Sequence, residues 1–169
     1  GVILVVKLLP RMFRVDLNKE AERIEKERAG KYPELETCIF KVTNTMVFGR
    51  TLAQLGLRTA TGAVISRIKS DGNILMPYAG YLVKEGDMLQ AVGTEESLNQ
   101  LSMLVGERSS GELPLGSQQS VESILVSRKD MVGKNLGSLN LQQNFSCTVT
   151  RVRRSGIDIT PSPDLSLKF

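Results

Sequence analysis

The sequence repeats itself at a spacing of 84 residues, and no other feature limits the possible folds as strongly. Residues 39–84 align without a gap with residues 123–168. The identical pairs are Val42 and Val126, Gly49 and Gly133, Leu52 and Leu136, Leu55 and Leu139, Leu57 and Leu141, Arg67 and Arg151, Gly72 and Gly156, Pro77 and Pro161, and Lys84 and Lys168. Because turn residues and apolar residues keep the same spacing, we interpret the repeat as a duplicated structural unit.

Both copies predict the same elements in the same order. A β-type run, CIFKVTN or SILVSRK, precedes a glycine turn and a short helical pattern with periodic leucines. An alternating strand follows and ends in a two-residue hairpin turn, for which the Asp-Gly of the first copy is a strong signal. The return strand ends at a proline, which cannot donate a hydrogen bond to a continuing strand. The recurring residues are Gly49, Gly72 and Pro77 in the first copy and Gly133, Gly156 and Pro161 in the second.

Only the first copy continues within this sequence. A turn at Gly86 and Asp87 leads to an apolar strand that ends near Gly93, and EESLNQLSMLVG then predicts a helix capped by Thr94. The second copy reaches DLSLKF before the position that matches Gly86. The sequence therefore predicts an α+β fold with two tandem copies of a small β-α-β-β-β-α module, the second incomplete at its C-terminal end.

The segments outside the two copies have a different character. Residues 107–120, ERSSGELPLGSQQS, are rich in Ser, Gly and Gln and lack an apolar period, which predicts a linker. Residues 16–30 predict an exposed helix. The predicted organisation is a transmembrane-helix end or edge segment at 1–15, a connecting helix and loop at 16–36, a first domain at 37–106, the linker at 107–120, and a truncated second domain at 121–169.

The first residues allow two interpretations. The chain is apolar to about Leu9 and then becomes basic at Arg11 and Arg14, as at the cytoplasmic end of a transmembrane helix. The alternative is a buried strand or helix at the edge of a domain. On the first interpretation the chain is part of a longer membrane protein. We would then expect further apolar runs before Gly1, and a turn, a strand, a helix and more apolar runs after Phe169.

Composition argues against several classes of function. The sequence contains no histidine, which excludes Ser-His and Cys-His catalysis and histidine-ligated metal sites. The net charge of +4 and the aromatic content of 5% do not provide the basic stripe or stacking surface of a nucleic-acid-binding protein. No paired carboxylates and no nucleophile with an adjacent base recur in both copies. We therefore expect no enzyme activity, metal, cofactor or nucleic-acid partner.

Basic residues on matching strands are the best candidates for a ligand site. Strand alternation places Arg67 and Lys69 on one face of the first hairpin. It places Arg151 and Arg153 on the equivalent face of the second hairpin, with Arg154 nearby. Because a guanidinium matches the paired oxygens of phosphate or carboxylate, these residues predict a site for a small anionic or nucleotide-like ligand. The alternative is that they form the solvated face of a half-exposed hairpin.

The repeated module resembles the TrkA C-terminal domain, also called RCK-C. The resemblance rests on VFGRTLAQL, matched by MVGKNLGSL, then an alternating strand with a cation, a glycine turn and a proline, and in the first copy EGDMLQAVG. The residues that carry it are Gly49, Leu52, Leu55, Arg67, Gly72, Pro77, Gly86, Asp87 and Gly93, with a second set from Gly133 to Pro161. The module occurs in regulators of potassium channels and transporters, so the resemblance implies a regulatory role.

Two such modules in tandem resemble the soluble insert of the aspartate:alanine exchanger family of membrane transporters. The resemblance implies a region on the cytoplasmic side of the cell membrane, between two bundles of transmembrane helices of the same protein. We expect such a region to sense a solute or to form a homodimer, and to regulate transport of an ion or amino acid.

Two other functions stay open at this point. An accessory regulatory subunit of a potassium transporter or channel would share the module without flanking membrane helices. A structural scaffold would use the duplicated domains only to hold transporter protomers together. Screening nucleotides, amino acids and cations for a rise in the thermal unfolding midpoint would separate a sensor from a scaffold, because a ligand of the folded state raises that midpoint.

Overall fold

The structure is a computed structural model that describes residues 33–117 and 119–168. The predictions for residues 1–15 and for residues 16–32 of the connecting segment lie outside the described residues. The described part contains a five-stranded sheet, a two-stranded sheet and several helices. The predicted mixture of helices and antiparallel strands is confirmed.

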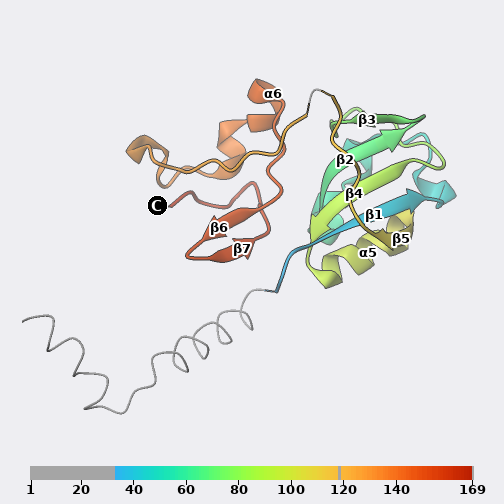
Figure 1. Ribbon diagram of the computed structural model, residues 1–169, viewed down its shortest axis with the longest axis horizontal. Coiled ribbons are helices and arrows are strands. Elements are labelled where there is room, and N and C mark those ends of the chain that lie inside the picture. Colours follow the sequence, from blue (N-terminus) through green and yellow to red (C-terminus); the bar gives the residue numbers. More distant parts are fainter. Residues whose placement is uncertain (1–32, 118, 169) are drawn as a thin grey trace, which may run out of the picture. The chain divides into compact units, whose positions relative to one another are not determined.

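The first copy forms the five-stranded sheet, with strand order β3-β2-β4-β1-β5 and antiparallel neighbours throughout (Figure 1). Its strands are β1 (Glu36–Val42), β2 (Val64–Ser70), β3 (Asn73–Leu75), β4 (Met88–Gly93) and β5 (Gly106–Ser110). Its helical elements are η1 (Thr45–Val47), α3 (Leu52–Leu55), α4 (Leu57–Thr61) and α5 (Glu95–Val105). Helix α5 contacts β1, β4 and β5, and α4 contacts α5 and β2, so these two helices pack together against the sheet.

Helix α5 is specified by two local signals, a capping residue at its start and a stripe of apolar residues along one face. The side chain of Thr94 accepts a hydrogen bond from the backbone N–H of Ser97 at the start of the helix. Leu98, Leu101 and Val105 follow at helical spacing, and all three are fully buried. The largest fully buried apolar side chains of the core are Phe40, Val42, Ile68, Val83, Leu89, Leu98, Leu101 and Val105.

The second copy repeats the short elements of the first. They are η2 (Lys129–Met131), η3 (Leu136–Leu139), α6 (Leu141–Phe145), β6 (Val152–Arg154) and β7 (Ile157–Ile159). The backbone N–H of Gly49 donates to the carbonyl of Val83 at 2.8 Å, and Gly133 donates to Leu167 at 2.9 Å. Both bonds lie at the same repeat positions, so the duplicated sequence specifies the same local backbone.

The hairpin turns of the two copies also share one conformation. Asp71 and Gly72 both have positive φ angles, of 49° and 82°, as a type I′ turn requires. Ser155 and Gly156 repeat this geometry with φ angles of 50° and 80°. The equivalent residues therefore occupy the same element in both copies.

Two predicted strands of the second copy are absent or shortened. Residues 123–129 form no strand, and the predicted strand at 146–154 forms only over β6. In the first copy, β1 and most of β2 pair with β4. The positions that match β4 are 172–177, which the sequence does not include, and only β6 retains a neighbour in β7. Within the described residues, Ile124 is 84% exposed, whereas its counterpart Phe40 is 0% exposed.

The prediction of a linker at 107–120 is wrong for its first residues. Residues 106–110 form β5, which pairs with β1 at the edge of the sheet. Arg108 on this strand contacts Glu36 of β1 at 3.2 Å and Glu95 of α5 at 2.8 Å. The sequence of the strand, GERSS, lacks the apolar alternation by which strands are predicted. The strand forms nevertheless, because main-chain hydrogen bonds to β1 and the ion pairs of Arg108 hold it in place.

The buried carboxylate of Asp87 holds the loop that precedes β4. Its Oδ2 atom accepts a hydrogen bond from the Tyr81 hydroxyl at 2.7 Å and another from the backbone N–H of Lys84 at 2.9 Å. Burial of the phenol raises the pKa of Tyr81 to about 12, and the nearby Asp87 carboxylate acts in the same direction. Tyr81 therefore remains protonated as a hydrogen-bond donor at neutral pH.

We expect the free energy of unfolding to fall as the pH rises from about 10 to about 12. The unfolded chain releases the phenol proton near pH 10, whereas the folded chain keeps it to about pH 12, so the folded state binds more protons in this interval. In urea unfolding across this range, Tyr81→Phe should flatten the decline. The exposed Tyr78→Phe is the control for loss of a hydroxyl. An unchanged slope in Tyr81→Phe would contradict the assignment.

Candidate ligand site

The arginines of the second hairpin lie close together and share one acidic partner. Arg153 donates to Asp158 at 2.8 Å, and Arg151 approaches the same carboxylate at 3.5 Å. The hydrogen bond from Arg153 is the main cause of the lowered pKa of Asp158. Arg154 is partly buried and donates to the backbone carbonyl of Ser166 at 2.6 Å. Arg151 and Arg153 are exposed, and they carry more positive charge than Asp158 neutralises.

The first hairpin does not present the matching surface. Arg67 is only 9% exposed, and its Nη1 atom donates to the backbone carbonyl of Leu113 at 2.5 Å and to Gln90 at 3.4 Å. Lys69 is half-buried. The alternative of a solvated face does not hold for Arg67, because the chain beyond β5 covers this position and supplies the carbonyl. Arg67 fixes the chain around Leu113, so its role as a ligand candidate stays a prediction that would require this contact to open.

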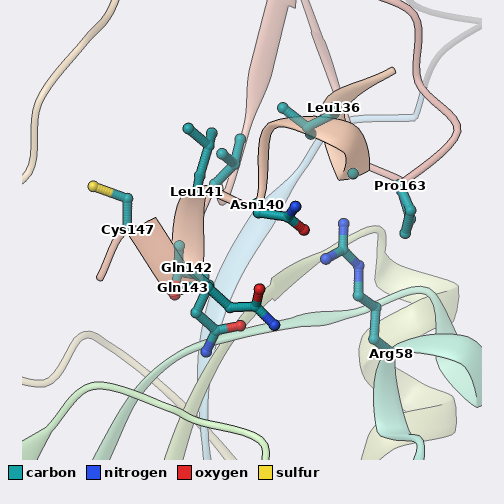
Figure 2. Close-up of a pocket in the computed structure, with 11 residues that line it drawn as sticks. Arg58, Leu136, Asn140, Leu141, Gln142, Gln143, Cys147 and Pro163 are labelled. Carbon is teal, nitrogen blue, oxygen red and sulfur yellow. The ribbon is translucent and has the colours of Figure 1, made fainter. Parts of the chain in front are cut away.

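A pocket of about 230 Å³ is lined by residues of both copies (Figure 2). Arg58 enters it from α4 of the first copy, whereas most of the lining comes from η3, α6 and the residues beside them. Its polar lining groups are Arg58, Asn140, Gln142, Gln143 and Thr148. The guanidinium of Arg58 points toward Asn140 and Pro163 in Figure 2. The pocket thus combines one permanent cation with several amide groups.

Two hydrogen bonds connect the copies beside this pocket. The Nη2 atom of Arg58 donates to the backbone carbonyl of Pro161 at 2.6 Å. The Nε2 atom of Gln142 donates to the backbone carbonyl of Pro77, also at 2.6 Å. Partial burial lowers the pKa of Arg58, although an arginine remains charged in proteins. Within the described residues, Arg58 forms no ion pair.

The sequence does not single out Arg58 or Gln142, although a signal is present. Both residues directly follow an identical leucine, Leu57 or Leu141, at the same repeat position. A donor side chain at that position of both copies is the pattern that could have indicated a shared role. The predicted basic residues lie on or beside strands, whereas the residues that line this pocket lie mainly on short helices and turns.

The described residues contain no group of three Cys, Asp or Glu side chains that could hold a metal ion. In the same part of the chain, no helix is both long and apolar enough to cross a membrane.

Comparison with known proteins identifies the first copy. The family model described as the TrkA-C domain matches residues 39–106. Residues 39–106 form a TrkA-C domain. The match begins within β1 and ends where β5 starts, so the TrkA-C domain comprises the sheet and helices described above.

Relatives of the whole chain, including its TrkA-C domain, are named as transporters. An uncharacterized transporter of Bacteroides thetaiotaomicron is 62% identical over 100% of this chain and 32% of its own length. A putative transport protein of Pectobacterium atrosepticum is 29% identical over 100% of this chain and 31% of its own length. The chain therefore spans about a third of the length of these curated relatives.

A solved structure also resembles part of the chain. The RCK_C domain dimer of S. agalactiae BusR, in complex with c-di-AMP, is 22% identical and covers 39% of this chain and 83% of its own chain, with a TM-score of 0.37.

Proposed function

We propose that the chain is a cytoplasmic regulatory region of an integral membrane transporter of the ion or amino-acid exchange type. The observation that carries the proposal is that transporters match this chain over its whole length, including its TrkA-C domain. The relatives are about three times as long as the chain, so a membrane part in the same polypeptide fits their names. The flanking membrane helices would be the direct partners of the region.

The chain is proposed to contain two TrkA-C-like domains, at 37–106 and 121–169. The second assignment rests on the 84-residue repeat and on the matching turns and backbone hydrogen bonds, such as those of Gly49 and Gly133. We further propose that the region forms a homodimer and responds to a small anionic ligand. Such a ligand can regulate transport only if it binds two arrangements of the region with different affinity.

An accessory potassium-transport subunit fits less well. A separate subunit would be matched by proteins of similar length, whereas these relatives carry the region within a longer chain named as a transporter.

Labelling of Cys147 in the full-length transporter tests the proposed location. Cys147 is exposed and Cys38 is buried, so a membrane-impermeant maleimide should react with the folded region at Cys147. We expect labelling in inverted membrane vesicles and none in intact cells, with Cys147→Ser as the control that identifies the labelled site. Labelling of Cys147 from outside intact cells would overturn the cytoplasmic assignment. Recovery of the unmodified protein in the soluble fraction would overturn the membrane assignment.

A further inference from the structure

The five-stranded sheet has a second face, opposite the helices, on which polar side chains are buried. Leu89 and Ala91 of β4 belong to the core that also contains residues of α5. Gln90 lies between them, so strand alternation turns its side chain to the opposite face. The cross-strand partners of Gln90 are Ile39 of β1 and Arg67 of β2. These three residues form a row across the middle of the sheet, and each of them is at least nine-tenths buried.

Residues 111–117, called the strap below, cover this row on the way from β5 to the second copy (Figure 1). The backbone N–H of Leu113 donates to Oε1 of Gln90 at 2.5 Å, and its carbonyl accepts from Nη1 of Arg67, also at 2.5 Å. A Cβ atom on Gly111 would lie 3.8 Å from the end of Ile39. Two side chains of the sheet thus bind both main-chain groups of one strap residue.

The strap is anchored at this one residue. Leu113 is 5% exposed and is the only buried residue among 111–117, whereas Leu115 is 48% exposed. The segment forms no helix or strand, so no regular backbone pairing holds it to the sheet. Burial of a single leucine side chain therefore supplies most of the apolar stabilisation of the closed strap.

A buried positive charge opposes this closure. Arg67 is 9% exposed and forms no ion pair with the residues that the structure describes. Burial of a charge is costly unless the charge is paired, and the neutral oxygens of Leu113 and Gln90 compensate it less fully than a carboxylate would. The free energy that favours the closed strap is therefore smaller than the burial of Leu113 alone would give.

The equivalent arginine of the second copy is open. The side chain of Arg151, the counterpart of Arg67, is 42% exposed and lies 3.5 Å from Asp158. Its Nη2 atom donates to the hydroxyl of Thr37 in the first copy at 3.3 Å. Two arginines at one repeat position thus differ in access to solvent, and the strap is the cause of the difference at Arg67.

We propose that residues 111–117 are a releasable strap, a cover anchored by Leu113 that controls access to Arg67 and Gln90. Opening leaves the sheet intact, because the strap contributes no strand to it. It uncovers a guanidinium and an amide that have lost their main-chain partners and can bind another acceptor and donor. The inference deepens the proposed regulatory role, on which its physiological meaning rests.

Chemical modification of Arg67 in the 169-residue chain tests this cover. Phenylglyoxal reacts with accessible guanidinium groups, and peptide mapping by mass spectrometry gives the rate at each arginine. We expect Arg67 to react more slowly than Arg153, whose side chain is 72% exposed. Leu113→Ala should raise the rate at Arg67 by at least about tenfold, because the lost apolar burial shifts the strap toward its open state. The rate at Arg153 should not change.

Leu115→Ala is the matched control, since it makes the same truncation in the same segment at an exposed position. The rate at Arg67 should then stay within about twofold of that of the unmodified chain. Equal rates at Arg67 and Arg153 in the unmodified chain would overturn the proposal, because Arg67 would then have no cover. An unchanged rate in Leu113→Ala would overturn it as well, because Leu113 would then not be the anchor.

Hydrogen exchange separates release of the strap from unfolding of the domain. Opening the strap exposes little surface, so the exchange rate of the Leu113 amide should change little with urea below the unfolding transition. The amides of β4 should exchange more slowly and should accelerate as urea is added. If the Leu113 amide shares the rate and the urea dependence of β4, the strap opens only when the domain unfolds, and the proposal fails. Neither measurement uses a membrane, so the outcome is separate from the labelling test of the proposed function.

Discussion

Phe40→Ala is expected to lower the free energy of unfolding by about 3–5 kcal/mol, the usual loss for a fully buried phenylalanine. Phe40 lies in the centre of β1, is 0% exposed, and belongs to the same core as Leu89 and Leu98. Removal of its ring leaves a cavity that the surrounding strands and helix α5 can fill only in part. Urea unfolding followed by circular dichroism measures the loss.

Ile124→Ala is the matched control at the equivalent position of the second copy. Ile124 is 84% exposed, so the same kind of truncation should change the free energy of unfolding by no more than about 0.5 kcal/mol. Equal losses for the two variants would show that both positions are buried in solution, and would contradict the difference between the copies.

Gly106→Ala is expected to lower the free energy of unfolding by about 2–6 kcal/mol, from backbone strain of about 1–3 kcal/mol and overpacking of similar size. Gly106 joins α5 to β5 with a φ angle of 136°, a backbone conformation that residues with a Cβ atom rarely adopt. An added Cβ atom would lie 2.5 Å from the carbonyl oxygen of Lys41 and would also collide with the side chain of Thr43. Because the carbonyl belongs to the paired strand β1, it cannot move without disturbing the sheet.

Gly111→Ala separates the two causes. Gly111 has a similar φ angle of 125°, but its nearest contact would be the flexible end of Ile39 at 3.8 Å. This variant should show the backbone strain alone, about 1–3 kcal/mol. Thermal or urea unfolding of both variants gives the comparison. If Gly111→Ala is as destabilising as Gly106→Ala, the close contact with β1 contributes nothing.

The elements that the sequence predicts well are those specified by local signals. The turn at Asp71 and Gly72 needs only its own two residues, and α5 needs only its cap and its apolar stripe. Strand β5 lacks such a signal, because its pairing depends on β1 and on the ion pairs of Arg108. Residues 123–129 have a strand-like sequence, but a strand requires a neighbour, and the described chain provides none for them.

The candidate site was harder to predict than the fold. Strand alternation places Arg67 on a surface, yet a carbonyl from Leu113, far away in the sequence, covers it. The pocket depends on how the copies meet, which no single copy specifies. Arg58 and Gln142 are visible as equivalent residues in the sequence, but their role becomes clear only when their acceptors, in the opposite copy, are known.

The acceptors of these two bonds are main-chain carbonyls, and this has an evolutionary consequence. A carbonyl is present whatever side chain the residue carries, so mutation cannot remove it. After duplication, these two contacts constrain each copy mainly at the position of the donor side chain. The present pair, an arginine and a glutamine, is already unequal. Substitution at the two acceptor positions would therefore leave these contacts with an acceptor, whereas substitution at the donor positions can remove them.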